Sequence, residues 1–226
     1  MPDLADEIRA ALAEMADPAR APDMQRYMKS DLPYLGAPKS RLTRVVMRMT
    51  KGAGLGREPW LATATGLWYQ AGYREERYAA LAVLRAGRLR PDDEPLLRRL
   101  ITTGAWWDLV DETATQLVGP LRDDLDIRAW AVDDDMWIRR AAIICQVGKR
   151  GRTTDPDLLA DCITPNIADR RFWITKAIGW ALRDYAYADP DWVRSFVATH
   201  ELAPLSVREA TKHLRPGGVP VTGSGA

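Results

Sequence analysis

The chain has little from which a disulfide framework, a membrane span or a sheet could be built. Its 226 residues include only two cysteines, Cys145 and Cys162, which form no CxxC pair and therefore imply neither a disulfide framework nor a zinc site. No stretch of about 18 uncharged apolar residues is present, so no membrane span is expected. No alternating run of β-branched residues is long enough for a sheet. Asp3, Asp6 and Glu7 stand where a secretory signal would place basic residues, so we expect a cytoplasmic protein.

Excess charge of one sign is also missing. The 32 Lys and Arg residues balance 31 Asp and Glu residues, which leaves a net charge of +1. This balance argues against a generally basic protein but not against a basic face on a balanced molecule. Phenylalanine is scarce, with two residues against nine Trp and seven Tyr, so the aromatic surface consists mainly of indole. A hydrophobic content of 46% is typical of a globular chain, and the length suffices for a sizeable core.

The spacing of apolar residues predicts helices along almost the whole chain. In residues 4–15, apolar side chains recur at positions 4, 8, 12 and 15, which is the stripe of an amphipathic helix. Proline repeatedly stands at a predicted first turn, as at Pro91, Pro156 and Pro190. The predicted helices cover residues 4–15, 22–28, 39–49, 59–69, 74–85, 91–101, 106–118, 122–131, 136–147, 156–164, 174–187, 190–199 and 206–214. The sequence therefore predicts an all-α fold.

The predicted helices also repeat. Five equivalent helix starts align at intervals of 33, 29, 36 and 32 residues: Tyr78, Asp111, Arg140, Lys176 and Arg208. Two short helices and their turns fit this period, and each repeat buries its apolar face by stacking on its neighbours. We therefore predict a HEAT-like helical repeat solenoid, an α-α superhelix, whose concave face is lined by Asp111, Arg140 and Lys176.

Two glycine-rich segments interrupt this pattern. Residues Lys51–Glu58 (KGAGLGRE) lack both the preceding strand and the GKS or GKT ending of a phosphate-binding loop, so we interpret them as a mobile connector between helices. Residues 216–226 contain nothing to bury and are predicted to be a flexible tail. The domain predicted from these boundaries is a single HEAT-like repeat domain over residues 1–215.

Two helical segments place candidate functional side chains on one face. Trp107 and Asp111 are four residues apart, so an indole and a carboxylate point to the same side of a helix. Lys176, Trp180 and Arg183 likewise share a face at positions i, i+4 and i+7. The small residue before Trp180, a glycine, is expected to let another group approach closely.

Charged residues are unevenly distributed. Basic residues recur in the second half of the chain at Arg139, Arg140, Arg183, Arg208, Lys212 and Arg215, whereas acids cluster at Asp123, Asp124, Asp126, Asp133, Asp134 and Asp135. The near-zero net charge would then result from a basic groove and an acidic edge that balance each other, as expected of a duplex-binding protein.

Each of these features has a purely structural alternative. A tryptophan in a helical repeat commonly packs in the core, and we expect this of Trp60, Trp68, Trp130 and Trp192. Asp111 could be a solvated surface residue or a helix cap, and Arg139 and Arg140 could simply pair with nearby aspartates. His200 and His213 are isolated from any candidate nucleophile or acid partner, so a histidine-driven mechanism is not expected.

Several strings of the sequence resemble the AlkD-like DNA alkylation repair family. The resemblance spans roughly residues 1–215, and the tandem Trp with its two Asp is its most specific motif. The strings that carry it are YMKS (27–30), YLG (34–36), AWWDLVD (105–111), WIRRAAI (137–143), WITKAIGWALRDY (173–185) and LAPLSVREATKH (202–213).

The resemblance implies a DNA glycosylase that acts on cationic N3- and N7-alkylated purines in duplex DNA, within base excision repair. It implies that Asp111, Trp107 and Trp180 form the catalytic site, and that Tyr27, Arg140 and Arg183 support this site or contact DNA. The charge pattern adds Lys176, Arg208 and Lys212 as candidate DNA contacts. We expect a monomer associated with the nucleoid of a bacterial cell, with no cofactor, no metal and no membrane partner.

These residue types suit that chemistry. Alkylation at N3 or N7 makes the purine a cationic leaving group, so the remaining task is to stabilise the oxocarbenium-like sugar, which a carboxylate such as Asp111 can do while positioning water. Indole faces bind a cationic nucleotide by cation–π contact. No catalytic amine is implied, which predicts a monofunctional enzyme that leaves an abasic site. The sequence leaves open the preferred adduct, from methyl groups to bulky natural products, and whether the nucleotide is flipped.

Two other classes of protein stay open. A catalytically silent repeat protein could bind damaged or distorted DNA with the same basic face. A protein–protein scaffold would instead have an apolar groove and a shallow salt dependence of any DNA binding.

Overall fold

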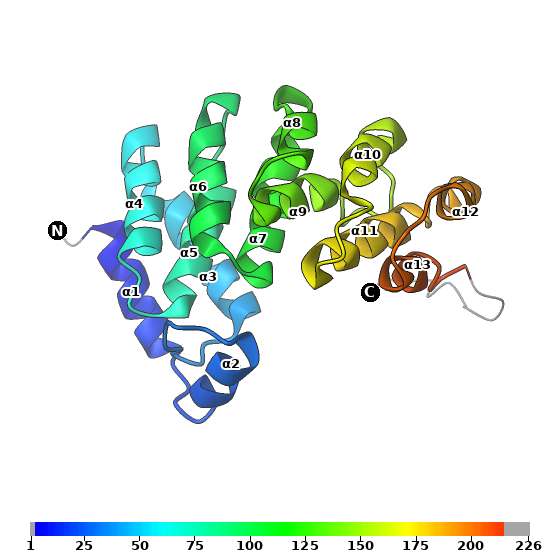
Figure 1. Cartoon of the computed structure of the whole chain (residues 1–226). Coiled ribbons are helices and arrows are strands. Elements are labelled where there is room, and N and C mark those ends of the chain that lie inside the picture. Colours follow the sequence, from blue (N-terminus) through cyan, green and yellow to red (C-terminus); the bar gives the residue numbers. More distant parts are fainter. Residues whose placement is uncertain (1–2, 215–226) are drawn as a thin grey trace, which may run out of the picture. The chain divides into compact units, whose positions relative to one another are not determined.

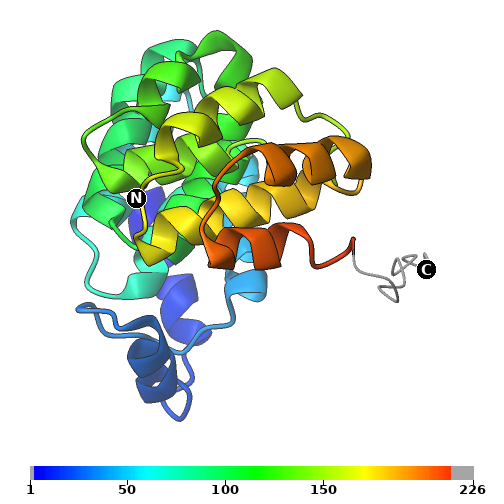
Figure 2. The same ribbon diagram turned by 45° about the vertical axis from the view of Figure 1, so that its right-hand side comes forward.

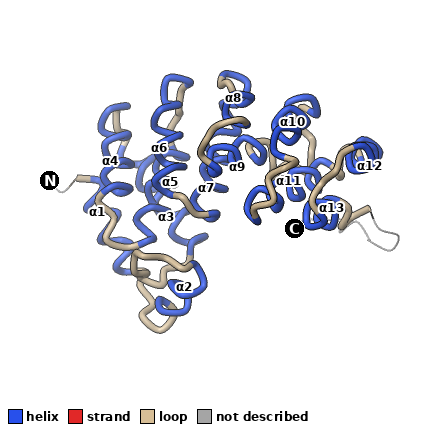
Figure 3. The backbone as a smooth tube through the Cα atoms, in the orientation of Figure 1, coloured by secondary structure: helices blue, strands red, loops and turns tan. Residues whose placement is uncertain are grey.

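The structure is a computed structural model, and it describes residues 3–214. Within this range the chain folds into thirteen α-helices with short 3-10 and π-helical turns and contains no β-strand (Figure 3). The all-α prediction is thus confirmed. No helix in the same range has the length and apolar character needed to cross a membrane. The predicted tail, and Arg215, lie outside the described residues.

The helices follow the order expected from the sequence, with shifted ends. They are α1 (Leu4–Glu14), α2 (Ala21–Met28), α3 (Lys39–Ala53), α4 (Arg57–Tyr69), α5 (Arg74–Ala86), α6 (Glu94–Gly104), α7 (Trp107–Thr113), α8 (Ile127–Ala131), α9 (Met136–Ile144), α10 (Pro156–Ile163), α11 (Phe172–Tyr185), α12 (Pro190–Thr199) and α13 (Pro204–Ala210).

The chain divides into two compact units, one ending at Leu89 and the other beginning at Arg90. In the first unit, α5 packs against α3 and α4, while α1 contacts all three (Figure 1). Fully buried side chains such as Leu12, Leu42 and Trp68 form its core. That residues 1–215 act as one continuous repeat domain stays a prediction.

A buried carboxylate attaches the segment after α2 to α5 in the first unit. Glu75 accepts hydrogen bonds from the backbone N–H groups of Leu35, Gly36 and Ala37 at 3.0, 2.9 and 3.2 Å. Burial raises the pKa of Glu75, and these backbone hydrogen bonds oppose that shift by favouring the charged form. A hydrogen bond of 2.8 Å between the hydroxyls of Tyr34 and Tyr78 completes the attachment.

In the second unit the helices stack in the manner of helical repeats. Helix α9 contacts both α7 and α11, and α13 lies along α11 (Figures 1 and 2). These four helices contain Asp111, Arg140, Lys176 and Arg208, which the repeat alignment matched. The all-α helical-repeat fold is therefore confirmed.

The glycine-rich segment Lys51–Glu58 is mostly helical, contrary to the expected mobile connector. Helix α3 continues through Gly52 to Ala53, Gly54 ends it with a left-handed φ of 58°, and α4 begins at Arg57. The connector thus shrinks to a three-residue turn, because one glycine suffices for the left-handed helix end.

The predicted continuous helix over 106–118 also differs from the structure. Helix α7 ends at Thr113, and residues 114–118 form a π-helical turn. Pro120 lacks the N–H that would continue the α-helical ladder, and a wider turn accommodates this end. A Cβ on Gly119 would lie 2.4 Å from the carbonyl oxygen of Cys145, so glycine is required for this close approach.

The tryptophans assigned to packing are buried as expected, with one only half-buried. Trp68 and Trp130 are fully buried, and Trp60 is 6% exposed. Two of these indole N–H groups form hydrogen bonds of 2.8 Å. Trp60 donates to the Val83 carbonyl oxygen, and Trp130 donates to the Glu94 carboxylate. Trp192 is half-buried and stacks on a phenylalanine of its own helix.

Gly179 allows a close approach, as expected, and the approaching element is α13. A Cβ at this position would lie 2.6 Å from the Glu209 Cβ and 3.0 Å from the Ser206 carbonyl oxygen. We therefore expect Gly179→Ala to lower the free energy of unfolding by about 1–3 kcal/mol, because α11 and α13 would have to separate. Urea denaturation measures this. Gly66→Ala is the matched control, since the same Cβ inside α4 meets nothing within 4 Å and should be neutral or slightly stabilising. Equal effects of the two substitutions would contradict the packing argument.

Candidate active site

The centre of the candidate site is an ion pair between Asp111 and Arg140. Each residue is the fifth of its helix, Asp111 in α7 and Arg140 in α9, so the two occupy equivalent positions in successive repeats. The guanidinium donates from Nε to Oδ1 at 2.7 Å and from Nη2 to Oδ2 at 2.8 Å. The side chain of Arg140 is 3% exposed and that of Asp111 is 15% exposed. This is a largely desolvated, bidentate pair, in which the fixed fork of the guanidinium sets the orientation of the carboxylate.

Arg140 also reaches the next repeat. Its Nη1 donates to the carbonyl oxygen of Trp173 at 2.5 Å, and its guanidinium carbon lies 5.7 Å from the centroid of the Trp173 ring. One buried cation therefore links α7, α9 and α11. The start of α9 is itself fixed by Asp135, which caps the helix by accepting from the Trp137 N–H at 2.7 Å.

Three further tryptophans cluster beside this ion pair. The ring centroids of Trp106 and Trp173 lie 5.5 Å apart, those of Trp137 and Trp173 lie 5.8 Å apart, and those of Trp106 and Trp137 lie 6.4 Å apart. Phe172, which is 54% exposed, makes an edge contact with Trp173 at 4.8 Å. We did not expect this cluster from the sequence. Its signal was the spacing: each tryptophan stands at the start of a repeat's second helix, 31 and 36 residues apart.

The two tryptophans expected in the catalytic site are both half-buried. Trp107 is the first residue of α7, one turn before Asp111, and Trp180 lies in the middle of α11. Neither belongs to the cluster of Trp106, Trp137 and Trp173. The structure thus brings Asp111 and Arg140 into contact and places Trp107 on the same helix as the carboxylate.

The cations expected to contact DNA fall into two groups. Lys176 and Arg183 both pair with Glu209 of α13, the former at 2.9 Å, and the hydrogen bond from Lys176 is the main reason why the pKa of Glu209 is lowered. Arg208 and Lys212 are exposed and form no ion pair within residues 3–214. Tyr27, in the first unit, is 77% exposed on α2.

Comparison with known proteins identifies the family of the chain. The family model of the DNA alkylation repair enzyme matches residues 8–214, which is nearly the whole described chain. The chain belongs to the DNA alkylation repair enzyme family. Its role therefore lies in the repair of alkylation damage. The resemblance noted in the sequence is confirmed at the level of the family.

A solved structure supports the same assignment. The structure of a predicted DNA alkylation repair enzyme from Enterococcus faecalis matches with a TM-score of 0.77 and 28% sequence identity, covering 88% of this chain and 97% of that one. No functionally curated protein matches the chain significantly.

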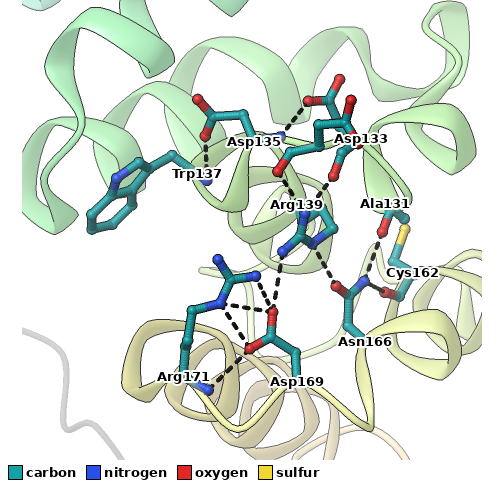
Figure 4. A network of polar contacts seen from close by, with 10 residues as sticks. Ala131, Asp133, Asp135, Trp137, Arg139, Cys162, Asn166, Asp169 and Arg171 are labelled. Atoms are coloured by element: carbon teal, nitrogen blue, oxygen red, sulfur yellow. Dashed lines mark hydrogen bonds and ion pairs between the residues drawn. The ribbon is translucent and has the colours of Figure 1, made fainter.

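Arg139 makes structural contacts with aspartate residues, which is the structural alternative that the sequence offered for it. It donates to the carbonyl oxygens of Asp133 and Asp134 and pairs with Asp169 at 3.1 Å, while Asn166 accepts from its Nε at 3.0 Å (Figure 4). The Trp137 ring, two residues earlier, points away from this network (Figure 4). Arg139 therefore joins successive repeats through polar contacts on a different side of α9 from Arg140.

Some acidic residues in the segment before α9 also cap helices or form ion pairs between them. Asp126 caps α8 by accepting from the Ala129 N–H, and Asp133 pairs with Arg98 of α6. Among residues 3–214 no group of three or more His, Cys, Asp or Glu side chains could hold a metal ion. Cys145 and Cys162 are buried, and desolvation raises the pKa of both thiols, that of Cys162 to about 12.

The buried ion pair predicts a large loss of stability on truncation. Arg140→Met should lower the free energy of unfolding by about 3 kcal/mol, because it leaves the Asp111 carboxylate desolvated without its counter-ion. Chemical denaturation measures this, and Asp111→Asn combined with Arg140→Met should restore part of the loss. Arg128→Met, which removes an exposed pair with Asp161, should have little effect on the free energy of unfolding. A loss at Arg140 no larger than at Arg128 would contradict the pairing.

The Asp169 carboxylate predicts a pH dependence of stability. Hydrogen bonds from Arg171, and a further one from Arg139, hold the pKa of Asp169 far below its usual range, against the opposing effect of burial. Because the pKa is lower in the folded state, the stabilisation is complete above the unfolded-state pKa of about 3.9 and is lost as the pH falls towards the folded value. The melting temperature should therefore drop less between pH 5 and pH 2.5 in Asp169→Asn than in the wild type. Asp191→Asn, in an exposed pair within one helix, should follow the wild-type slope.

Proposed function

We propose that the protein is a monofunctional DNA glycosylase that hydrolyses the N-glycosidic bond of cationic N3- and N7-alkylated purines in duplex DNA. The observation that carries the proposal is the bidentate pair of Asp111 and Arg140. It holds a partly exposed carboxylate in one orientation, and Trp107 stands one turn away on the same helix. Family membership supports the substrate class at the coarser level of alkylated DNA.

The reaction needs little from the protein beyond electrostatics. The bond between C1′ and the purine nitrogen breaks, and its electron pair neutralises the cationic ring, so the leaving group departs without protonation. Water then adds to C1′ and releases a proton, giving an abasic site and a neutral alkylpurine. Asp111 stabilises the positive charge that develops on the sugar and orients the attacking water.

Arg140 acts through Asp111 as a positioning residue. Its side chain is 3% exposed, which favours a supporting role over direct contact with DNA. The guanidinium fixes the two carboxylate oxygens in advance, and the site therefore needs no reorganisation as charge develops.

Aromatic and basic residues complete the proposed interaction with DNA. Trp107 and Trp180 hold the cationic nucleotide by cation–π contact, at about 0.5–2 kcal/mol each. Tyr27, Lys176, Arg183, Arg208 and Lys212 contact the DNA backbone. Phosphate contacts of this kind release counter-ions, so affinity for duplex DNA should fall steeply as salt rises.

Replacing the carboxylate with its neutral isostere tests the proposal. Asp111→Asn should reduce single-turnover release of 7-methylguanine and 3-methyladenine from methylated duplex DNA by about 100-fold or more, because the negative charge is lost while the shape is kept. Chromatography of the released bases measures this. Glu112→Gln, at the next position of α7, is the matched control and should retain release.

The outcomes separate the proposed enzyme from a silent binding protein. If the wild type releases no base from any alkylated DNA yet binds damaged duplex tightly, the glycosylase proposal is wrong. If Asp111→Asn releases bases at the wild-type rate, the assignment of Asp111 is wrong.

A further inference from the structure

A second group of polar side chains gathers where three segments meet at the far ends of α9, α11 and α13. Arg150 belongs to the loop after α9, Tyr187 follows α11, and His213 follows α13. The Arg150 guanidinium carbon lies 5.2 Å from the centroid of the Tyr187 ring. The Tyr187 hydroxyl and His213 Nε2 are 2.8 Å apart, and the two ring centroids are 4.7 Å apart. Tyr187 is 41% exposed, so the group opens to solvent.

The loop that carries Arg150 is held in a defined conformation. The Asp184 carboxylate accepts from the backbone N–H groups of Gly148 and Gly151, both at 3.2 Å. Gly151 has a φ of 69°, and a Cβ there would lie 2.8 Å from the Ala188 Cβ and 3.0 Å from Tyr185. Arg150 itself has a φ of 52°, a region that residues with a Cβ rarely adopt. The packing therefore fixes a loop that would otherwise avoid this shape, and it sets Arg150 over Tyr187.

The cations of this group have few acidic partners. Arg150 and Lys212 form no ion pair within the described residues, Arg183 pairs with Glu209, and the nearby Asp184 is engaged with backbone amides. The positive charges of Arg183, Lys212 and Arg150 act on His213, while Glu209 shares its charge between Arg183 and Lys176. Burial first, and then these three positive charges, lower the pKa of His213. Such a cluster of like charges is favourable only when an anion neutralises it.

We propose that Arg150, Tyr187, Lys212 and His213 form a phosphate-binding site that takes a phosphodiester of duplex DNA and that binds a proton on His213 together with it. The proposal rests on the DNA binding proposed above, but it concerns the backbone and not the lesion. The Lys212 ammonium and the Arg150 guanidinium supply charge, and the tyrosine hydroxyl and the imidazole supply directional hydrogen bonds.

The proton comes from solvent and changes the hydrogen bonds of His213 in a defined way. In the neutral ring only one nitrogen donates, whereas both donate in the imidazolium. When protonated, His213 donates from Nε2 to the Tyr187 hydroxyl oxygen and from Nδ1 to a phosphate oxygen. The phosphate lowers the cost of placing a fourth positive charge among Arg150, Lys212 and Arg183, so DNA and proton favour each other's binding.

NMR titration of the histidines tests this directly, because the chain has only two, His200 and His213. The full-length protein is titrated between about pH 5 and pH 8, with and without an undamaged 16-base-pair duplex. We expect the midpoint of His213 to rise by at least about 0.5 pH unit with DNA, which corresponds to about threefold tighter DNA binding to the protonated form. His200, whose ring stacks on Phe196, is the internal control and should not shift. An unchanged His213 midpoint in saturating duplex would overturn the proposal.

Variants separate this site from general electrostatics. Arg150→Gln should weaken binding of undamaged duplex about 3- to 10-fold at pH 6, whereas Arg128→Gln, which neutralises an exposed arginine paired with Asp161, should have less than a twofold effect. His213→Gln should bind DNA with the same affinity at pH 6 and pH 7.5, in contrast to the wild type. Equal effects of Arg150→Gln and Arg128→Gln would contradict the site.

A parallel titration with inorganic phosphate distinguishes the sources of the anion. If the titration midpoint of His213 shifts with the duplex but not with 10 mM phosphate, the backbone contact is supported. If the midpoint shifts with phosphate but not with the duplex, the site binds a free anion and the backbone contact is overturned. Because the duplex is undamaged, these results do not depend on base release. If the titration midpoint of His213 shifts with duplex DNA but no alkylpurine is released, the phosphate site is supported and only the glycosylase proposal is contradicted.

Discussion

The desolvated pair of Asp111 and Arg140 is the constraint on which the second unit depends. A buried guanidinium is costly unless its charge is matched and its donors are satisfied, and Arg140 meets both needs by spanning from α7 to the carbonyl of Trp173 in α11. Three successive repeat helices must therefore keep their relative positions for the pair to exist. The Trp173 ring lies beside the Arg140 guanidinium and contacts the rings of Trp106 and Trp137 in turn, so the aromatic cluster is joined to the pair. Stability and site geometry are thus determined by the same few contacts.

The pairing also shapes the electric field at the site. A lone carboxylate attracts cations over a long range, whereas a carboxylate with an adjacent guanidinium acts as a dipole whose field falls off faster with distance. A cationic sugar in contact with the exposed edge of Asp111 would be stabilised, while cations a few ångströms away would feel little attraction. This arrangement suits a site that must act on a charge that appears only during the reaction, because it favours the transition state over loosely bound ions.

The sequence was sufficient to predict most of the helices and the equivalence of Asp111 and Arg140, because these depend on local spacing and on the repeat interval. The family was predicted from the resemblance of motifs such as AWWDLVD (105–111). The sequence did not predict the tryptophan cluster or the pairing of Lys176 and Arg183 with Glu209, since these depend on how far each helix is rotated against the next. Gly179 shows where prediction from the sequence ends. Its small size indicated a close approach, but only the packing of α13 on α11 shows which group approaches. The glycines of Lys51–Glu58 likewise suggested a loop, whereas α3 tolerates Gly52 and only Gly54 requires a left-handed backbone. The catalytic roles of Trp107, Asp111 and Trp180 stay proposals.

Helix α11 connects the two sites described for the second unit. Trp173, which accepts a hydrogen bond from Arg140, is its second residue, and Tyr187 of the proposed phosphate site lies just beyond its end. Fourteen helical residues rise by about 20 Å, which equals about six base-pair steps of duplex DNA. Under the two proposals made above, the length of α11 would set the distance between the damaged base and the contacted phosphate. A homologue with one turn more or one turn fewer in this helix would then contact the DNA backbone about 5 Å farther from or closer to the damaged base.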